Sequence, residues 1–337
     1  MTAPLVSVIA PCYNAAPSLA QALESLRWQS LEQWECIIVD DGSTDGSAQI
    51  AEDFCARDSR FRIVVQKHHG AAAARNRGVE AARGSFIQFL DADDLLLGDK
   101  LKDAVARLSS HSPNHVLYCE YALLAQDGSF FRTLPARIPD ADAVRSFLFR
   151  WNVDFIIPIH SFLFPADLVR RYPFRPSHVE DVECWIRMAM DGVMFEHVDR
   201  VDVVYRISAG SVTRNEEQLY RERIKVSGMF REQPAFAGYE KEFERNDHWL
   251  RRRLAIALCM EKKFGEARTV IRSEWSHASA REKMKMVTWF LLMTVFSKDT
   301  VFALRERLAS ASMVRSGGWK LYRPWEPPRA VKNLLQF

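Results

Sequence analysis

The sequence has no Cys-x-x-Cys pair, and no apolar run approaches the roughly 18 residues that a membrane-spanning helix needs. Its six cysteines are scattered, which argues against a zinc site and indicates a reduced, cytosolic protein. The N-terminus lacks a basic stretch followed by a long apolar one, so we expect no signal peptide. The net charge of +3 is too small to indicate a nucleic-acid partner by itself.

Three familiar site motifs are also missing. No Gly-x-Gly-x-x-Gly follows the first predicted strand and no Gly-x4-Gly-Lys-[Ser/Thr] occurs, which disfavours dinucleotide oxidoreductases and P-loop enzymes. The absence of Gly-x-Ser-x-Gly disfavours an α/β-hydrolase. The composition is otherwise ordinary for a globular protein, and 337 residues fit two domains or one large domain with an extension.

Alternating strand and helix patterns fill the first third of the chain. We expect strands at 6–10, 34–39, 61–65, 85–90 and 115–122, separated by helices at 17–28, 45–56, 70–82 and 99–109. This alternation predicts βαβ units around a parallel sheet. Later elements are a hairpin turn at 126–129, helices at 146–150 and 182–190, and strands at 162–164 and 201–206. From residue 216 the pattern is helical, with a helical hairpin at 249–275 and an extended Pro-rich stretch at 322–328.

Carboxylates follow two of the predicted strands. Asp91, Asp93 and Asp94 come after strand 85–90, and Asp41 comes after strand 34–39. Open α/β sheets bind ligands at the carboxyl ends of their strands. Closely spaced carboxylates become favourable together when a hard cation lies between them and a phosphate. The sequence therefore predicts a metal-bound, phosphorylated ligand at one edge of the sheet.

Two further segments suit such a ligand. Small residues open the helix at 70–82, which lets a diphosphate approach backbone N–H groups, and Arg75 or Arg77 could add a charged contact. An Ala-rich packing helix with surface arginines is an equal alternative. After the first strand, Tyr13 could stack on a base and Asn14 could cap the next helix.

In order and spacing, four segments resemble the family 2 glycosyltransferases of GT-A fold. They are Ser7–Asn14, Val39–Asp45, Ala74–Gly78 and Leu90–Asp94, within a match over about residues 4–110 that continues more weakly to Thr213. The resemblance implies a Rossmann-like, mostly parallel sheet flanked by helices, with a C-terminal helical extension. It also implies Mn²⁺ or Mg²⁺, a nucleotide-sugar donor (UDP-sugar by default) and a saccharide or lipid-linked acceptor in cell-envelope polysaccharide synthesis.

The same resemblance assigns roles to residues. Asp91 and Asp93 would form a DxD motif that holds the cation against the donor diphosphate, and Asp41 would contact the nucleobase. The predicted donor-contact residues are Pro11, Tyr13, Asn14, Asp41, Arg75, Asn76, Asp91 and Arg206. Arg206 lies in a Tyr-Arg-x-His-like segment in which Ser208 stands where the family has His.

The catalytic base would come from an acidic helix start. Asp181 is the preferred residue, with Glu180 beside it and Glu183 as a competitor, because a first-turn position stabilises the carboxylate that takes the acceptor's proton. The resemblance implies direct displacement with inversion. His160 would either face the acceptor or be a buried structural residue.

We expect a catalytic domain at 1–215, divided near residue 110 into nucleotide-sugar and acceptor halves, and a helical region at 216–337. From Tyr220 onward there are 24 Lys and Arg against 13 Asp and Glu, and an eleven-residue apolar run spans 286–296. These features predict peripheral contact with the inner face of a membrane or, alternatively, a solvated helix face and a core helix. The alternative functions are a sugar nucleotidyltransferase, a glycoside hydrolase and a non-catalytic binding module.

Overall fold

The structure is a computed structural model of the chain. It describes residues 3–133, 135–139, 142–151, 155–207, 215–295, 322–328, 331–332 and 335. The chain divides into two compact units: a sheet unit of Met1–Ser208 with Tyr322–Phe337, and a helical unit of Ala209–Leu321. Within the described ranges, no helix combines the length and the apolar character needed to cross a membrane.

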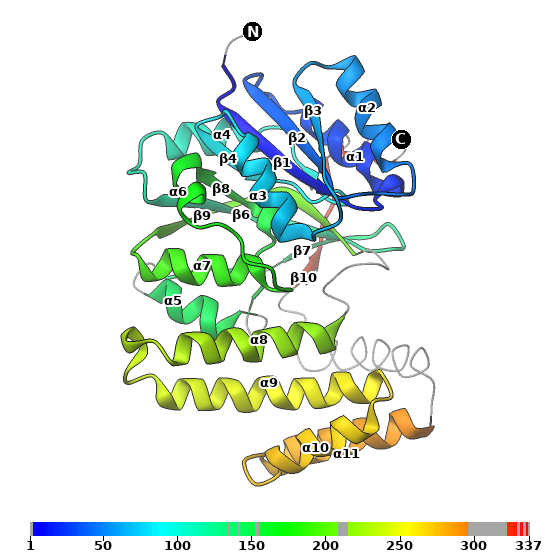
Figure 1. Cartoon of the computed structure of the whole chain (residues 1–337), viewed down its shortest axis with the longest axis vertical. Helices are drawn as coiled ribbons and strands as arrows, with labels where there is room; N and C mark the ends of the chain where they lie inside the picture. Colours follow the sequence, from blue (N-terminus) through cyan, green and yellow to red (C-terminus); the bar gives the residue numbers. More distant parts are fainter. Residues whose placement is uncertain are drawn as a thin grey trace. The chain divides into compact units, whose positions relative to one another are not determined.

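The sheet unit begins with four parallel strands and their crossover helices (Figure 1). The elements are β1 (Val6–Cys12), α1 (Ala16–Arg27), β2 (Trp34–Asp40), α2 (Ser47–Arg57), β3 (Phe61–Val65), α3 (Ala71–Ala81) and β4 (Phe86–Phe89). All seven residues of β1 and of β2 are buried, as expected for parallel strands covered on both faces. The predicted alternation is confirmed to within a few residues at each boundary.

Helix α3 approaches β1 very closely. A Cβ atom at Gly78 would lie 2.3 Å from Cγ2 of Ile9, so only glycine allows the contact. Gly70, at φ 88, precedes the helix in a conformation that other residues rarely adopt. Gly78 therefore lets the second half of α3 pack directly on β1, and Gly70 forms the turn from which the helix begins.

The remaining strands extend the sheet with mixed direction. They are β5 (Leu95–Leu96), β6 (His115–Leu124), β7 (Phe130–Thr133), β8 (Phe162–Pro165), β9 (Met194–Arg206) and β10 (Tyr322–Pro324), in the order β10-β7-β6-β8-β4-β1-β2-β3 with β9 beside β5 and β6. The predicted hairpin is confirmed as β6 and β7. Strand β9 starts seven residues before its predicted beginning. The Pro-rich stretch contributes β10, which pairs antiparallel with β7.

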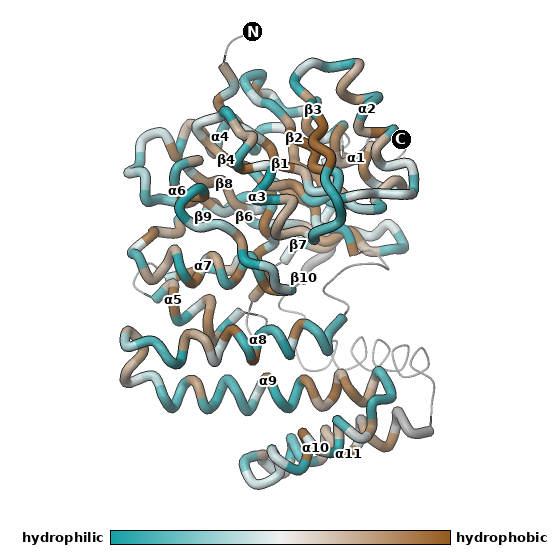
Figure 2. Tube along the Cα trace, viewed as in Figure 1, coloured by the Kyte–Doolittle hydropathy of each residue, from teal (hydrophilic) through white to brown (hydrophobic). Residues whose placement is uncertain are grey.

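Helices and short turns complete the sheet unit. They are α4 (Lys100–Leu108), α5 (Ala143–Arg145), α6 (Ala166–Arg171), α7 (Glu180–Met190), a π-helical turn (Ser146–Arg150) and a 3₁₀ turn, η3 (Ile159–Ser161). Apolar residues of α1, α2 and α4 share one core cluster with strand residues, so these helices cover the same face of the sheet. Figure 2 shows hydrophobic residues concentrated along β3.

The helical unit contains α8 (Glu216–Arg231), a 3₁₀ turn (Pro234–Phe236), α9 (Glu240–Met260), α10 (Phe264–Glu274) and α11 (Ala280–Val295). The predicted helical hairpin is confirmed as α9 and α10, joined at Lys262, whose φ is 59. Leu254, Leu258 and Ala267 are buried in its core. Hydrophilic and hydrophobic residues alternate along α9 (Figure 2), as an amphipathic helix requires.

Candidate functional site

The loops after β1 and β2 are tied together by polar contacts. The Asn14 side-chain oxygen accepts a hydrogen bond from the backbone N–H of Thr44 at 2.8 Å, and the Asn14 N–H donates to Ser43 Oγ at 3.0 Å. Asn14 has a positive φ of 49, which asparagine tolerates better than most residues. Pro11 is buried in β1, so of the predicted residues in this segment Tyr13 and Asn14 are the exposed ones.

Asp41 organises the loop that leads into α3. Its carboxylate accepts hydrogen bonds from Gln66 Nε2 at 2.7 Å and from the N–H groups of His69 and Gly70, each at 2.8 Å. It also lies 2.9 Å from His68 Nδ1. Burial raises the pKa of Asp41, but these donors outweigh it and hold the pKa below its usual value. Asp41 is therefore a charged anchor for residues 66–70, with both oxygens already engaged.

An aromatic stack stands beside this anchor. The rings of Tyr13 and His68 are stacked with centroids 4.0 Å apart, and Tyr13 is 48% exposed. A nucleobase can stack on an exposed ring of this kind. The sequence did not predict that His68 would cover one face of Tyr13, because the two residues are 55 positions apart.

Arg75 joins two predicted motifs that lie far apart in the sequence. Its guanidinium contacts Asp91 at 2.9 Å and Glu180 at 2.6 Å, and its side chain is 9% exposed. Desolvation lowers the pKa of Arg75, but the two carboxylates outweigh it and raise the pKa above its ordinary value. The next residue, Asn76, exchanges two hydrogen bonds with the backbone of Phe174, at 2.8 and 2.9 Å. Helix α3 thus holds the loop after β4 and the start of α7 together.

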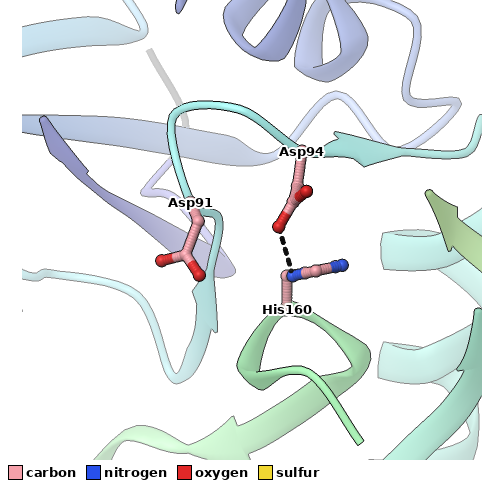
Figure 3. A group of neighbouring side chains, drawn as sticks. All are labelled: Asp91, Asp94 and His160. Atoms are coloured by element: carbon pink, nitrogen blue, oxygen red, sulfur yellow. Dashed lines mark ion pairs between the residues drawn. The ribbon is translucent and has the colours of Figure 1, made fainter. Parts of the chain in front are cut away.

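A second polar group lies behind the loop after β4. The Asp94 carboxylate accepts from the Arg206 N–H at 2.7 Å and lies 3.0 Å from His160 Nδ1, and neither Asp94 nor His160 has an exposed side chain. Figure 3 shows the Asp94 carboxylate facing the His160 ring, with Asp91 at the other end of the loop. His160 is therefore buried and lies against Asp94, and a role toward the acceptor stays a prediction. The contact between His160 and Asp94 was not predictable from the sequence, because 66 positions separate the two residues.

Asp91, Asp94 and His160 offer ligand atoms that all lie within 4.8 Å of one another. Asp93 is outside this group. Desolvation, followed by repulsion from Asp94 and Asp91, raises the pKa of Asp93 to about 7. A divalent cation would relieve that repulsion, and oxygen ligands suit Mn²⁺ and Mg²⁺. The residues present therefore fit such a cation.

Arg206 brings a positive charge to the same loop, near the carboxylates of Asp94 and Asp93. Its guanidinium donates to the backbone oxygen of Asp93 at 2.8 Å and to Gln21 Oε1 at 2.7 Å. Among the residues that the structure describes, no carboxylate lies within 4 Å of the guanidinium. Burial lowers the pKa of Arg206. Ser208, which stands where the family has His, lies outside the described residues.

The three carboxylates at the start of α7 lie in different environments. Glu180 is paired with Arg75, and Glu183 is buried between Arg175 at 3.0 Å and Arg187 at 2.9 Å. Asp181 accepts only from the N–H of Val182, at 2.7 Å, and no cation in the described part of the chain lies within 4 Å of it. Desolvation and the neighbouring Glu180 raise the pKa of Asp181 to about 6. This environment suits a proton acceptor that works near neutral pH.

Comparison with known proteins gives a matching family model and named relatives. Residues 7–163 match the model described as glycosyl transferase family 2. Two similar proteins come from Bacillus subtilis (strain 168). The putative glycosyltransferase EpsH is 39% identical over 127 residues, which are 38% of this chain and 36% of EpsH. The putative teichuronic acid biosynthesis glycosyltransferase TuaG is 41% identical over 127 residues, 37% of this chain and 50% of TuaG. The chain thus spans between a third and a half of these relatives.

Two solved structures are similar over most of the chain. TarS 1–349 of S. aureus, in complex with UDP-GlcNAc, has a TM-score of 0.54 and 19% identity, covering 86% of this chain and 81% of that one. The mannosyltransferase PcManGT of Pyrobaculum calidifontis, in complex with GDP-Man and Mn²⁺, has a TM-score of 0.55 and 18% identity, covering 94% and 89%. These likenesses confirm the fold that the sequence predicted.

Proposed function

Because residues 7–163 of this chain match the model of glycosyl transferase family 2, we propose that the protein transfers a sugar from a nucleoside-diphosphate sugar to an acceptor hydroxyl. UDP is the default nucleotide, and inversion is the expected stereochemistry. The acceptor would be a saccharide or a lipid-linked saccharide in cell-envelope polysaccharide synthesis, the setting that the name of TuaG suggests. Residues 1–215 would carry the reaction, and 216–337 would form the helical region.

The observation that carries this proposal is the bridge from Arg75 to both Asp91 and Glu180. It fixes the predicted donor motif and the predicted base motif side by side, although they are about 90 residues apart in the sequence. A displacement reaction needs this proximity, because the acceptor oxygen must reach the sugar while the donor diphosphate is held.

Each of the residues on the donor side has a separate proposed role. Tyr13 would offer an exposed ring to the base, and Asp41 would hold the loop at 66–70 that faces it. Asp91 and Asp93 would hold the divalent cation, since Asp94 is already engaged with Arg206 and His160. When bound, Mn²⁺ or Mg²⁺ supplies positive charge to the leaving diphosphate.

Two of the chain's own side chains complete the proposed chemistry. The Arg206 guanidinium, held by the backbone oxygen of Asp93, would supply a second positive charge to that diphosphate, where negative charge develops as the sugar departs. Asp181 would accept the proton of the acceptor hydroxyl as its oxygen attacks the anomeric carbon.

Release of the nucleoside diphosphate tests this proposal without a known acceptor, because water serves as a slow substitute. We expect the full chain with Mn²⁺ or Mg²⁺ to release a nucleoside diphosphate from one member of a sugar-nucleotide panel, and chelation by EDTA to stop the release. A coupled assay for the diphosphate measures the rate. The Asp93→Asn variant controls for contaminating hydrolases, and equal release by that variant would contradict the proposal.

We further propose that the protein stays in the cytoplasm and touches the inner face of the membrane through α11. Met284, Val287 and Leu291 are exposed large apolar residues at helical spacing, and Lys283 lies 5.3 Å from the Trp275 ring. An apolar stripe flanked by lysines is typical of a helix lying in a membrane interface. Sedimentation with anionic liposomes at low salt should be several-fold weaker for Leu291→Ser than for the wild type. Equal sedimentation of the two, or none, would contradict the contact.

A further inference from the structure

A cavity of about 360 Å³ lies between α4, β6 and β9. Its walls include Lys100 and Ala104 on α4, Leu117 on β6, Val198 on β9, and Ser161 on η3. Neither Asp91, Asp93 nor Asp181 lines it. Asp103 and Arg107, also on its wall, are exposed residues, so the cavity is open to solvent.

Lys100 is a buried cation on this wall without an anionic partner. It is 2% exposed, and its ammonium donates to the Ser161 backbone oxygen at 3.0 Å and to Cys119 Sγ at 3.6 Å. No carboxylate among the described residues lies within 4 Å of its Nζ. An unpaired buried charge is costly, so the folded protein keeps Lys100 here against a free-energy penalty.

The other charges around the cavity are already paired. Arg200 forms ion pairs with Asp103 and Asp202, and Arg107 contacts Glu196 at 3.3 Å. The lining residues thus leave one positive charge, that of Lys100, without a counter-charge.

A buried hydroxyl on the same wall also lacks a partner. Ser161 is 1% exposed, and none of the residues that the structure describes forms a hydrogen bond with its Oγ. Ala104, Leu117, Leu163 and Val198 give the wall an apolar part. A ligand that satisfies these groups has one negatively charged oxygen group and a compact apolar part.

We propose that this cavity binds a small organic anion, with Lys100 as its counter-charge and Ser161 as a hydrogen-bond partner. The shared chemistry is an anionic oxygen on a short carbon chain, which either a carboxylate or a phosphate monoester supplies. The cavity volume is enough for a ligand of several non-hydrogen atoms, and the apolar wall accommodates its carbon part.

Ligand-observed NMR on the full chain in EDTA tests the proposal, with butyrate and methyl phosphate as separate probes. EDTA removes metal-dependent binding at the donor site. We expect one of the probes to bind the wild type and Lys100→Met to weaken that binding at least about ten-fold, since a charged hydrogen bond is lost. The matched control is Lys102→Met, an exposed lysine on the same helix, which should bind as the wild type does.

Two further variants provide a substitute for Lys100→Met and a control for binding at the donor site. Ser161→Ala should weaken binding about five-fold and serves if Lys100→Met does not fold. Arg206→Met should bind the probe normally, because Arg206 belongs to the donor site. The proposal is overturned if neither probe binds the wild type, if Lys100→Met and Ser161→Ala bind as tightly as the wild type, or if only Arg206→Met loses binding.

Discussion

Asp181→Asn is expected to lower kcat about 1,000-fold while leaving donor affinity within about two-fold of the wild type. The substitution removes the only α7 carboxylate in the described structure that has no cationic partner within 4 Å, and an amide cannot accept the acceptor's proton. Donor affinity should hold because Arg75 still pairs with Asp91 and Glu180. Steady-state kinetics with titration of the nucleotide measure both quantities.

The pH dependence gives an independent check on Asp181. Since the pKa of Asp181 is raised to about 6, the carboxylate is the active form above that pH and the carboxylic acid is the inactive form below it. The wild-type kcat should therefore rise through pH 6 to a plateau, and Asp181→Asn should lack this acidic limb. If Glu180→Gln removed the limb and Asp181→Asn kept it, the proton acceptor would be Glu180.

Arg75→Met is expected to abolish activity and to destabilise the sheet unit by about 3–5 kcal/mol, because it leaves Asp91 and Glu180 without their shared buried cation. The two carboxylates would then repel, and the start of α7 would lose its link to the loop after β4. Urea unfolding, followed through the fluorescence of the chain's nine tryptophans, which include the buried Trp185, measures the change in the free energy of unfolding.

Arg77→Met is the matched control for this prediction. Arg77 lies on the same helix, is exposed and pairs only with Glu80 in the described structure, so its removal should change stability by less than about 0.5 kcal/mol. A stable and active Arg75→Met variant would show that the bridge between the two motifs is dispensable. Loss of stability with full activity would limit Arg75 to a structural role.

Local sequence patterns predicted the parallel half of the fold well. Strands β1 and β2 are mostly apolar, with one polar residue inside each (Ser7 and Glu35), and turn-forming residues follow them, Asn14 after β1 and Gly42 after β2. The pairing of β10 with β7 was not predictable, because it joins Tyr322 to Thr133 across 189 positions. The early residues of β9 were also missed, since Glu196 and Asp199 interrupt the apolar pattern of that strand.

In the candidate site, too, the residues of short motifs were predictable, whereas the contacts between distant parts of the chain were not. The sequence named Asp91, Glu180 and Arg75, because each stands in a recognisable short motif. It did not predict that Arg75 would bridge the other two, nor that His160 would pair with Asp94, since both contacts join elements far apart in the chain. Asn76 was predicted to contact the donor, and the structure shows its amide engaged with the backbone of Phe174.

The most direct test of the account is isothermal titration of sugar nucleotides into the wild type and Asp93→Ala, with and without Mn²⁺. We expect one nucleotide to bind the wild type only with the metal, and Asp93→Ala to lose this binding while its unfolding curve stays close to that of the wild type. Such a result would establish a metal-dependent donor site after β4 and identify its base. Metal-independent binding that persists in Asp93→Ala, or no binding of any sugar nucleotide, would contradict it.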